Sequence, residues 1–466
     1  MNPLLLSEIA RMTGGRLHGD DRLVDAVATD TRSLGGLGSA LFVALKGERF
    51  DGHDHVAAAA HAGVTAALVS RHVDAPLPQV VVADTERALA AIATAVQLGR
   101  SATVVAITGS NGKTSVKALT QSILERAGRT YATPGNRNNE IGMPLAVIDA
   151  PEDARFAIYE MGTGKPGDIA YLTAIARPDI GLVNNVAPAH IERMGSLLAI
   201  ADTKAAVYDD LSSNGVAVIN ADDAFAPYFA ERAHGRRLIR FGLDHGADVS
   251  ARDIELADEG SRFTLVTPQG DAPVALAMPG RHNVRNALAA AAIAIGAGVP
   301  LATIAEGLAA ARPVAGRLVT HVLPGGARLI DDSYNANPGS LAAAIDTLAE
   351  SSRGAGDAAW LVLGDMRELG ADGAAMHAEV GRRAKAAGLA RLFTLGPLSA
   401  SAAQAFGDGA AHFESHDALA GALRAAIADS GGALRVLVKG SRGSAMDRIV
   451  TALLPDGAAH GGHHAA

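Results

Sequence analysis

Apolar residues follow two spacings along the middle of this chain, and each spacing predicts a different kind of element. Short apolar runs predict buried strands, and segments with apolar residues every three or four positions predict helices. After the first run, for example, Val116, Leu119, Ile123, Leu124 and Ala127 share one helical face. We expect strands at residues 102–108, 155–162, 179–186, 215–223 and 237–242. Helical segments separate these runs, which indicates a parallel sheet covered by helices on both faces.

The pattern changes after residue 260. A two-residue period over 261–280 predicts an antiparallel hairpin, and the alanine-rich segment 282–298 predicts a buried helix. A second hairpin is expected over 323–334. Strand and helix then alternate again, with strands expected at 358–366, 391–396 and 435–441. This part of the chain therefore predicts a second doubly wound domain.

The length of the chain, 466 residues, indicates three domains at about 100 to 200 residues each. A helical segment ends near Arg100, ahead of the 102–108 strand, and the second boundary falls near Pro313. We expect domains at 1–100, 101–313 and 314–456, with a disordered tail at 457–466. The predicted fold class is α/β, with a small mixed α/β N-terminal domain, a central P-loop-type parallel-sheet domain and a C-terminal Rossmann-like domain.

Composition narrows the classes of function. The net charge is −8 without a dense basic run, which argues against nucleic-acid binding. Cysteine is absent, so disulfides and thiolate metal sites are excluded and a reducing compartment is favoured. Apolar stretches are shorter than a membrane span, and the N-terminus lacks the pattern of a signal peptide. We therefore expect a cytoplasmic protein without membrane insertion.

A glycine-rich turn follows the first strand of the central segment and precedes its first helix. It consists of Gly109, Ser110, Asn111, Gly112, Lys113, Thr114 and Ser115. The glycines let backbone N–H groups turn toward an anion, and the helix N-terminus favours negative charge. Lys113 is expected on the terminal phosphates of a nucleotide and the Thr114 hydroxyl on Mg²⁺. The common phosphate loop has a further glycine where this chain has Ile107, so the loop is a shortened form.

Three further polar residues of the central segment are candidates for chemistry. Glu160 ends a predicted parallel strand, where ligands bind in such sheets, and a carboxylate suits Mg²⁺. A solvated strand-end glutamate is the equal alternative. His190 follows another strand end, and Lys204 lies in a predicted helix. Taken alone, an ordinary loop histidine and a helix-surface lysine are the simpler interpretations.

Three strands of the C-terminal segment end in polar loops. The first ends at Asp331 and Asp332 and leads to a turn that contains Tyr334, Asn335 and Asn337. This turn fits either a capped helix start or a site loop. The other two loops are 364–365 and 439–442. Together they indicate that one edge of this sheet faces a ligand.

The motif "TGSNGKT" resembles the shortened phosphate loop of the Mur ligases, the ATP-dependent amide-forming enzymes of peptidoglycan precursor synthesis. The resemblance covers nearly the whole chain except the tail. It includes "DTRSLGGLGSALFVALKGERFDGHD", "TPGNRNNEIGMP", "EMGTGKPGDI", "PAHIERMGSLLAIADTKA", "GRHNVRNALAAAA", "DDSYNANPGSLAAA", "LVLGDMRELG" and "LVKGSRGSAMDRIV". "DDSYNANP" and "GDMRELG" are the most specific, and they resemble the branch that joins D-alanyl-D-alanine to UDP-N-acetylmuramoyl-tripeptide.

The resemblance implies an ATP-dependent ligase with ATP and Mg²⁺ as cofactors, a UDP-sugar-binding N-terminal domain, a central ATPase domain and a C-terminal domain that swings in. It implies an enzyme that forms an acyl phosphate and releases ADP and phosphate, and we expect a monomer. The catalytic positions of the family match Lys113, Glu160, His190 and Lys204. The metal ligands of the family match Thr114, Glu160, His190 and Lys204. Lys204 matches a lysine that is often carbamylated.

The resemblance also assigns binding residues in all three domains. Asn286 matches the adenine contact, and Arg317 and Asp331 match groups that hold ribose and phosphate. The positions that resemble substrate contacts are Thr31, Arg32, Gly47 and Asp51 for uridine diphosphate, Asn136, Asn138 and Asn139 in the central domain, and Tyr334, Asn335 and Asn337 for the dipeptide.

Three other functions are compatible with a nucleotide loop of this kind. They are a folylpolyglutamate-synthase-like ligase, a nucleotide-switched binding or scaffold protein, and a UDP-sugar kinase. The absence of an Asn-Pro-Arg motif argues against the sibling branch that adds the third peptide residue. The sequence leaves open whether that third residue is meso-diaminopimelate or lysine.

Overall fold

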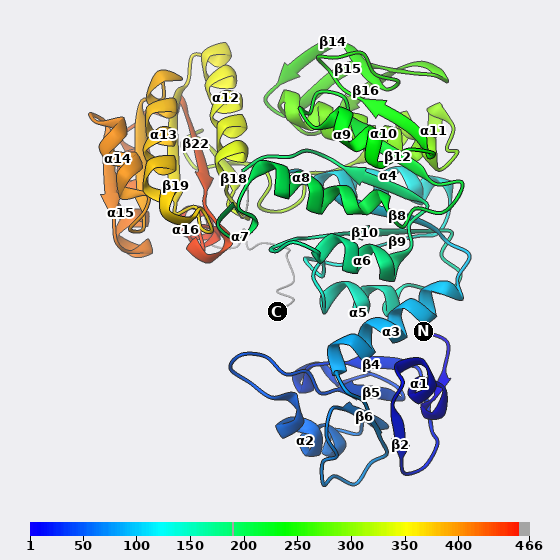
Figure 1. The fold of residues 1–466 in the computed structure, drawn as a ribbon. Coiled ribbons are helices and arrows are strands. Elements are labelled where there is room, and N and C mark those ends of the chain that lie inside the picture. Colours follow the sequence, from blue (N-terminus) through cyan, green and yellow to red (C-terminus); the bar gives the residue numbers. More distant parts are fainter. Residues whose placement is uncertain (189–190, 456–466) are drawn as a thin grey trace.

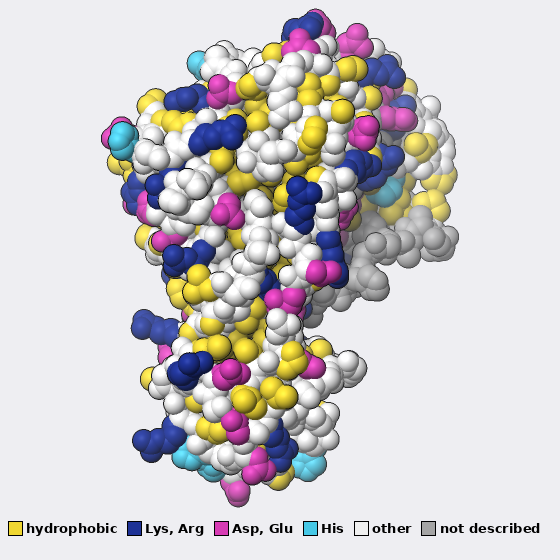
Figure 2. Space-filling model, turned by 90° about the vertical axis from the view of Figure 1, so that its right-hand side faces the viewer, with side chains coloured by type: hydrophobic (Ala, Val, Ile, Leu, Met, Phe, Trp, Pro, Cys, Tyr) yellow, Lys and Arg dark blue, Asp and Glu magenta, His cyan; other side chains and the backbone are white. Residues whose placement is uncertain are grey.

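The computed structural model describes residues 1–188 and 191–455, and it has the α/β architecture expected from the sequence. His190 and the tail at 457–466 lie outside the described residues. Figure 1 shows the N-terminal domain below the central domain and the C-terminal domain beside the central one. In the side view of Figure 2, the N-terminal domain joins the rest of the molecule through a narrower waist.

The N-terminal domain contains a five-stranded sheet in the order β2-β7-β6-β5-β4, parallel except for the β2–β7 pair. Its strands are β2 (Arg16–His18), β4 (Ala26–Ala28), β5 (Ala40–Val43), β6 (Ala66–Val69) and β7 (Gln79–Val81), with β1 (Leu4–Leu5) paired to β3 (Leu23–Val24). Its helices are α1 (Leu6–Thr13), η1 (Thr31–Ser33), η2 (Gly52–His55), α2 (Val56–His61) and α3 (Thr85–Leu98).

The central domain is built on a six-stranded parallel sheet in the order β13-β12-β11-β8-β10-β9. Its strands are β8 (Thr103–Thr108), β9 (Thr130–Ala132), β10 (Phe156–Glu160), β11 (Ile180–Val183), β12 (Val216–Asn220) and β13 (Arg237–Phe241). The five strands expected from apolar runs are confirmed. Strand β9 was missed because three half-buried residues make no apolar run.

Helices cover both faces of this sheet, as the alternating pattern predicts. They are α4 (Lys113–Ala127), α5 (Gly142–Asp149), α6 (Asp168–Ala176), α7 (Ile191–Met194), α8 (Leu197–Ala205), η3 (Ala206–Tyr208), α9 (Ala226–Arg232), α10 (Arg281–Gly296) and α11 (Leu301–Ala310). The predicted face of α4 is confirmed, since Val116, Leu119, Ile123 and Leu124 are buried. Helix α10 is buried along most of its length, as its alanine-rich sequence predicts.

A three-stranded antiparallel ribbon precedes α10 and packs on α10 and α11 (Figure 1). It consists of β14 (Ser250–Ala257), β15 (Gly260–Thr267) and β16 (Gly270–Leu276). The hairpin of β15 and β16 was expected, and β14 extends it by a strand. Most of β14 is only half-buried or exposed, so its sequence carries no strong apolar pattern.

The C-terminal domain has a six-stranded sheet in the order β17-β18-β22-β19-β20-β21, in which only the β17–β18 pair is antiparallel. Its strands are β17 (Val319–Val322), β18 (Arg328–Asp332), β19 (Ala358–Gly364), β20 (Arg391–Leu395), β21 (Ala410–Phe413) and β22 (Leu434–Lys439). Its helices are α12 (Pro338–Ala355), η4 (Gly370–Asp372), α13 (Gly373–Ala386), α14 (Ala400–Phe406), α15 (His416–Ala428), η5 (Arg442–Ser444) and α16 (Asp447–Leu453). None of the described helices is long and apolar enough to cross a membrane.

The hydrophobic cores show which domains are packed together. One continuous cluster runs from Leu6 and Leu89 in the N-terminal domain to Val104 and Met143 in the central domain. The C-terminal sheet has separate clusters on its two faces. The N-terminal and central domains therefore share one cluster, and each also has a cluster of its own, whereas the clusters of the C-terminal domain are separate from both.

Arg100 fixes the junction between the N-terminal and central domains. Its side chain is 1% exposed and donates hydrogen bonds to the carbonyl oxygens of Val147, Ile148 and Ala150 at the end of α5. A cation at the C-terminus of a helix also complements the helix dipole. Arg100 therefore joins the linker to the central domain through buried polar contacts.

Arg100→Ala is expected to lower the free energy of unfolding by roughly 2–4 kcal/mol, because it removes the side-chain donor to the buried carbonyl oxygens of Ile148 and Ala150. Urea unfolding followed by circular dichroism measures the change. The matched control is Arg129→Ala, which removes an arginine that is 58% exposed and pairs with Asp153. The control should shift stability by less than about 0.5 kcal/mol. Equal losses in both variants would contradict the assigned role of Arg100.

Candidate functional site

A cavity of about 750 Å³ lies between the central and C-terminal domains, at the carboxyl ends of their parallel strands. Ligands bind at this edge in doubly wound sheets. Residues from both domains line it, namely 110–115, 136, 138–140, 160, 162–165, 168, 171–172, 185, 187, 193, 282–283, 285–286, 317–318, 332, 334–337, 339–340, 343–344, 439 and 442. The glycine loop, Asn136, Asn138, Asn139, Asn286, Arg317, Tyr334, Asn335 and Asn337 thus meet at one place.

The glycine loop connects β8 to α4 and is held closely against its neighbours. Gly112 precedes α4 with φ of 78°, and a Cβ there would lie 2.6 Å from Asn184 Nδ2 and from Asn286 Oδ1. Only glycine fits this position. The backbone N–H of Asn111 donates to Asn185 Oδ1 at 2.8 Å. The end of β11 and helix α10 therefore fix the shape of the loop.

Lys113 begins α4 and turns back over the loop. Its Nζ donates to the Gly109 carbonyl oxygen at 2.8 Å. Burial and the charge of Arg317 lower the pKa of Lys113, while Glu160 opposes this change. The N-terminus of α4 and the Lys113 ammonium both favour negative charge at the glycine loop.

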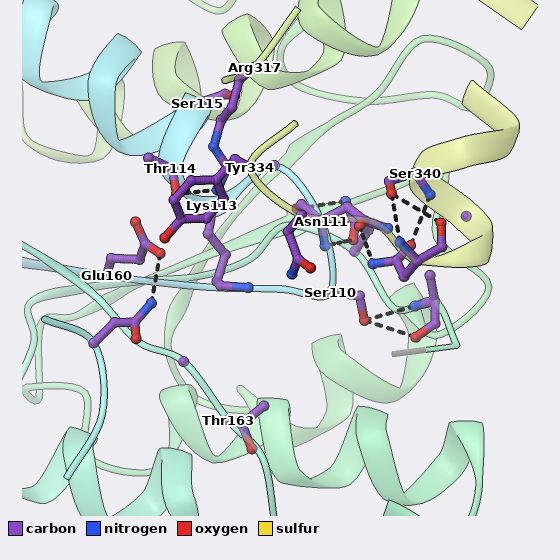
Figure 3. A pocket seen from close by; sticks show the side chains of 18 of the residues that line it. Ser110, Asn111, Lys113, Thr114, Ser115, Glu160, Thr163, Arg317, Tyr334 and Ser340 are labelled. Carbon is purple, nitrogen blue, oxygen red and sulfur yellow. Dashed lines mark hydrogen bonds between the residues drawn. The ribbon is translucent and has the colours of Figure 1, made fainter. Parts of the chain in front are cut away.

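Glu160 is 3% exposed, so it is not a solvated strand-end glutamate. Asn138 Nδ2 donates to its Oε1 at 2.9 Å, and Lys117 Nζ lies 3.2 Å from its Oε2. Burial alone would raise the pKa of Glu160, but Lys117, Lys113 and the Asn138 hydrogen bond together hold it below its usual value. Figure 3 shows the carboxylate of Glu160 beside the loop.

Lys117 was not singled out from the sequence. It lies one helical turn after Lys113 on α4, so both side chains face the same region. Its Nζ also donates to the Thr133 and Gly135 carbonyl oxygens at 2.9 and 3.1 Å. The i, i+4 spacing of the two lysines was the signal that could have identified it.

Lys204 is 2% exposed near the end of α8, so the interpretation as a helix-surface lysine is wrong. Burial and the charge of Lys113 lower its pKa well below the usual value. Lys204 is not among the residues that line the cavity. Within residues 1–188 and 191–455, no cluster of three or more histidine, aspartate or glutamate side chains could hold a metal ion.

Arg317 reaches from the C-terminal side of the cavity to the glycine loop. Its NH2 donates to Thr114 Oγ1 at 3.0 Å, and its guanidinium lies 4.5 Å from the ring centroid of Tyr334 (Figure 3). Arg442 lies 5.8 Å from the same centroid. Tyr334 therefore helps to hold both arginines at the cavity.

Asn337 both caps a helix and lies at the cavity, and these are the two alternatives that the sequence left open for its turn. It caps α12, with Oδ1 accepting from the Ser340 N–H at 2.9 Å. Its Nδ2 donates to Asn111 Oδ1 at 2.7 Å, and the residue lines the cavity. The start of α12 thus contacts the glycine loop directly.

The strand ends of the C-terminal sheet differ from one another in what they face. Asp331 is 1% exposed, accepts from the Ser333 N–H and hydroxyl, and does not line the cavity. Asp332 lines it and pairs with Lys439 at 2.5 Å. Burial raises the pKa of Asp332 in spite of Lys439. Asp365 accepts from backbone N–H groups at the start of α14 and does not line the cavity.

The remaining predicted contacts lie in the N-terminal domain, away from this cavity. Thr31 and Arg32 form η1, and the Arg32 guanidinium pairs with Asp30. Asp51 accepts from the backbone N–H and the ring Nδ1 of His53. A Cβ on Gly47 would lie 2.5 Å from the ring of Phe50. The structure gives their positions, and their roles in binding remain predictions.

The sheet, the glycine loop and the cavity define a P-loop-type nucleotide-binding protein with three domains. Family models match most of the chain. They are "Mur ligase family, catalytic domain" over residues 23–106, "Mur ligase middle domain" over 107–294 and "Mur ligase, glutamate ligase domain" over 316–442. The chain belongs to the Mur ligase family.

Individual relatives agree over their full lengths. The chain is 43% identical to the UDP-N-acetylmuramoyl-tripeptide–D-alanyl-D-alanine ligase of Escherichia coli K12, covering 98% of this chain and 100% of the relative. It is 35% identical to the ligase of that name from Bacillus subtilis 168, covering 96% of this chain and 98% of the relative.

Solved structures show the same similarity. A crystal structure of MurF from Acinetobacter baumannii matches with a TM-score of 0.92 and 32% identity over 97% of this chain and 99% of that one. MurF from Thermotoga maritima in complex with ADP matches with a TM-score of 0.81 and 26% identity, over 92% and 97% of the two chains. Mycobacterium tuberculosis folylpolyglutamate synthase shares the fold at 19% identity, with a TM-score of 0.63 over 79% and 93% of the two chains.

Lys117→Met is expected to destabilise the protein by about 3–5 kcal/mol, because it removes the closest cation from a buried carboxylate. The double variant Lys117→Met/Glu160→Gln should recover most of this loss, since it removes the charge that lacks a partner. Urea unfolding of the two single variants and the double variant gives the coupling between the residues. Additive losses would contradict the proposed pairing.

Proposed function

We propose that this protein joins D-alanyl-D-alanine to UDP-N-acetylmuramoyl-tripeptide in an ATP-dependent reaction of peptidoglycan precursor synthesis. The observation that carries the proposal is the meeting of the glycine loop and the 334–337 turn in one cavity. The full-length similarity to ligases of this name supports the choice of substrates.

The reaction needs an activated carboxyl group, because a carboxylate has no usable leaving group at neutral pH. The terminal phosphoryl group of ATP moves to the terminal carboxylate of the tripeptide and gives an acyl phosphate. The free amine of the dipeptide then attacks the acyl carbon, and phosphate leaves with the formation of the amide. Lys113 and the N-terminus of α4 offset the charge of the phosphoryl group in transfer.

Two contacts in the cavity must change when the nucleotide binds. Lys113 Nζ leaves the Gly109 carbonyl oxygen for the phosphates, and Arg317 leaves the Thr114 hydroxyl. Arg317 then faces the nucleotide from the C-terminal domain, with Tyr334 holding its guanidinium. The C-terminal domain therefore completes the site and excludes water from the acyl phosphate.

The residues at the loop fit a magnesium ion. Glu160 Oε2 is buried, has the ion pair with Lys117 at 3.2 Å but accepts no hydrogen bond from the described residues, and lies in the same cavity as the Thr114 hydroxyl. Oxygen ligands of this kind suit Mg²⁺. We assign Thr114 and Glu160 as its ligands, with His190 and carbamylated Lys204 as further ligands suggested by the family resemblance. When bound, the ion supplies positive charge to the phosphates of ATP.

The family resemblance also assigns the residues that contact the substrates. Thr31, Arg32, Gly47 and Asp51 lie in the domain that we assign to the uridine diphosphate group. Asn136, Asn138 and Asn139 line the cavity on the tripeptide side, and the 334–337 turn is assigned to the dipeptide. Asn286 lies beside the loop and is assigned to adenine, whereas Asp332 faces the cavity in place of Asp331. We further propose a monomer that acts in the cytoplasm, where ATP is available.

The test is phosphate release from purified protein with MgATP, UDP-N-acetylmuramoyl-tripeptide and D-alanyl-D-alanine, each omitted in turn, with the product identified by mass. Release that requires all three, with a pentapeptide product, is the expected result. Both forms of the tripeptide, with meso-diaminopimelate or lysine, should be compared. Release without any acceptor would instead favour a nucleotide-switched binding protein, and a stable phosphorylated sugar would favour a kinase.

Lys113→Ala is expected to lower kcat by roughly 10²–10³-fold, since it removes a cation that contacts the phosphoryl group in transfer. Binding of the UDP-linked tripeptide, measured by calorimetry, should stay near normal because the N-terminal domain is unaffected. Lys165→Ala, at an exposed position on the same cavity, is the control and should retain most of the activity. Unchanged turnover in Lys113→Ala would overturn the assignment of the phosphate site.

Lys204 is expected to carry a carbamate, because burial lowers the pKa of its amine and so favours the neutral form, which reacts with CO₂. The reaction forms an N–C bond and releases a proton. Isotopically labelled bicarbonate should give a carbamate signal in the NMR spectrum that disappears in Lys204→Met and persists in Lys165→Met. A spectrum without that signal would contradict the modification.

A further inference from the structure

The central and C-terminal domains also meet at a site far from the glycine loop along their strands. Asp258, in the turn between β14 and β15, contacts Arg435 near the start of β22 and Arg328 at the start of β18. The cavity lies at the carboxyl ends of these parallel strands, whereas Arg328 and Arg435 lie at their amino ends. The two domains are thus in contact at both the carboxyl ends and the amino ends of the strands of the C-terminal sheet.

The contact has the geometry of a strong ion pair. Arg435 NH1 donates to Asp258 Oδ1 and NH2 to Oδ2, both at 2.6 Å. Arg328 NH1 donates to Asp258 Oδ2 at 3.0 Å. The side chain of Arg435 is 3% exposed and that of Asp258 is 30% exposed. Bidentate pairs of arginine and carboxylate fix relative orientation as well as distance.

A residue of the C-terminal domain itself orients Arg435 for this contact. Its Nε donates to Asp357 Oδ2 at 2.8 Å, just ahead of β19. If the domains separate, Asp357 keeps the guanidinium paired and aimed at the position of Asp258, while Asp258 returns to water. Arg435 is therefore preorganised to form the contact again, and its own charge stays paired with Asp357 when the domains separate.

The contacts at the cavity cannot keep the two domains in one orientation while the nucleotide binds, because they use atoms of the nucleotide site. Arg317 donates to the Thr114 hydroxyl and Asn337 to the Asn111 side chain. Both partners belong to the glycine loop, so nucleotide binding alters these contacts. Asp258, Arg328 and Arg435 do not line the cavity, and their contact can persist through that exchange.

The ribbon that carries Asp258 is packed against an element that lines the cavity. It packs on α10 and α11, and the first turns of α10 carry His282, Asn283 and Asn286, which line the cavity. Asp258 is therefore held on a packed element of the central domain, and the arginines are held on two neighbouring strands of the C-terminal sheet.

We propose that Asp258 is a positioning residue: through Arg435 and Arg328 it holds the C-terminal domain in the orientation that brings Arg317 and Asn337 to the glycine loop. Its effect on turnover rests on the proposed ligase function. Its effect on the orientation of the domains does not, so the two can be tested separately.

The orientation test uses two spin labels at introduced cysteines, since the chain has none of its own. Glu231→Cys on α9 and Gln404→Cys on α14 place labels at exposed positions of the two domains. The parent protein should give one narrow distance distribution. Asp258→Asn, which keeps the size of the side chain and removes its charge, should broaden the distribution and add a second population. An unchanged distribution in Asp258→Asn would overturn the proposal.

Two further variants separate positioning from a loss of folding. Asp253→Asn removes a charge from the same ribbon, where Asp253 pairs with Arg252, and should leave the distribution narrow. Asp258→Glu retains the carboxylate and should restore much of the parent distribution. Broadening in Asp253→Asn equal to that in Asp258→Asn would mean a general effect on the ribbon and would overturn the proposal.

Turnover provides the second measurement. Asp258→Asn should lower kcat/KM for ATP by about tenfold and leave the affinity for the UDP-linked tripeptide unchanged, because only the C-terminal domain is displaced. Asp258→Glu should recover most of the rate. If the parent protein forms no amide, the proposed function fails while the distance measurement still decides the role of Asp258. Normal kcat/KM in Asp258→Asn would overturn the role in positioning the catalytic groups.

Discussion

The site depends on the close approach of the glycine loop to β11 and α10 at Gly112. With φ of 78° and no room for a Cβ, this residue lets α4 begin directly against Asn184 and Asn286. Any side chain there would move the start of α4 and, with it, Lys113 and Thr114. The shortened loop is therefore held by hydrogen bonds to asparagine side chains of neighbouring elements.

The charges around this loop are arranged for an anion. The charge of Arg317 lowers the pKa of Lys113, the charge of Lys113 lowers the pKa of Lys204, and Glu160 is the carboxylate that pairs with Lys117. Neighbouring cations therefore repel one another in this part of the site. This repulsion, together with burial, lowers the pKa values of Lys113 and Lys204. The negative charge of a bound polyphosphate would offset this repulsion. Carbamylation of Lys204 would relieve it further by replacing an amine with an anion.

Local patterns predicted much of this fold, and non-local contacts account for what was missed. The α4 face, the parallel strands and the glycine loop all follow from short-range spacing. Strand β9 was missed because its pairing is set by β10, which lies elsewhere in the sequence. The burial of Lys204 likewise depends on the packing around α8. The sequence could place Asp331 and Asp332 at a strand end, but which of the two faces the cavity depends on the orientation of β18 between its neighbours. Asp258 had no local signal, because its partners lie in another domain.

The shared hydrophobic core of the N-terminal and central domains has a consequence for the substrate. Because these domains pack into one body and Arg100 anchors the linker between them, the span between the N-terminal domain and the glycine loop is fixed. A ligand that is held at its nucleotide end by the first domain can present its far end to the phosphates only if its length matches that span. The paired domains would therefore accept only a substrate of the matching length.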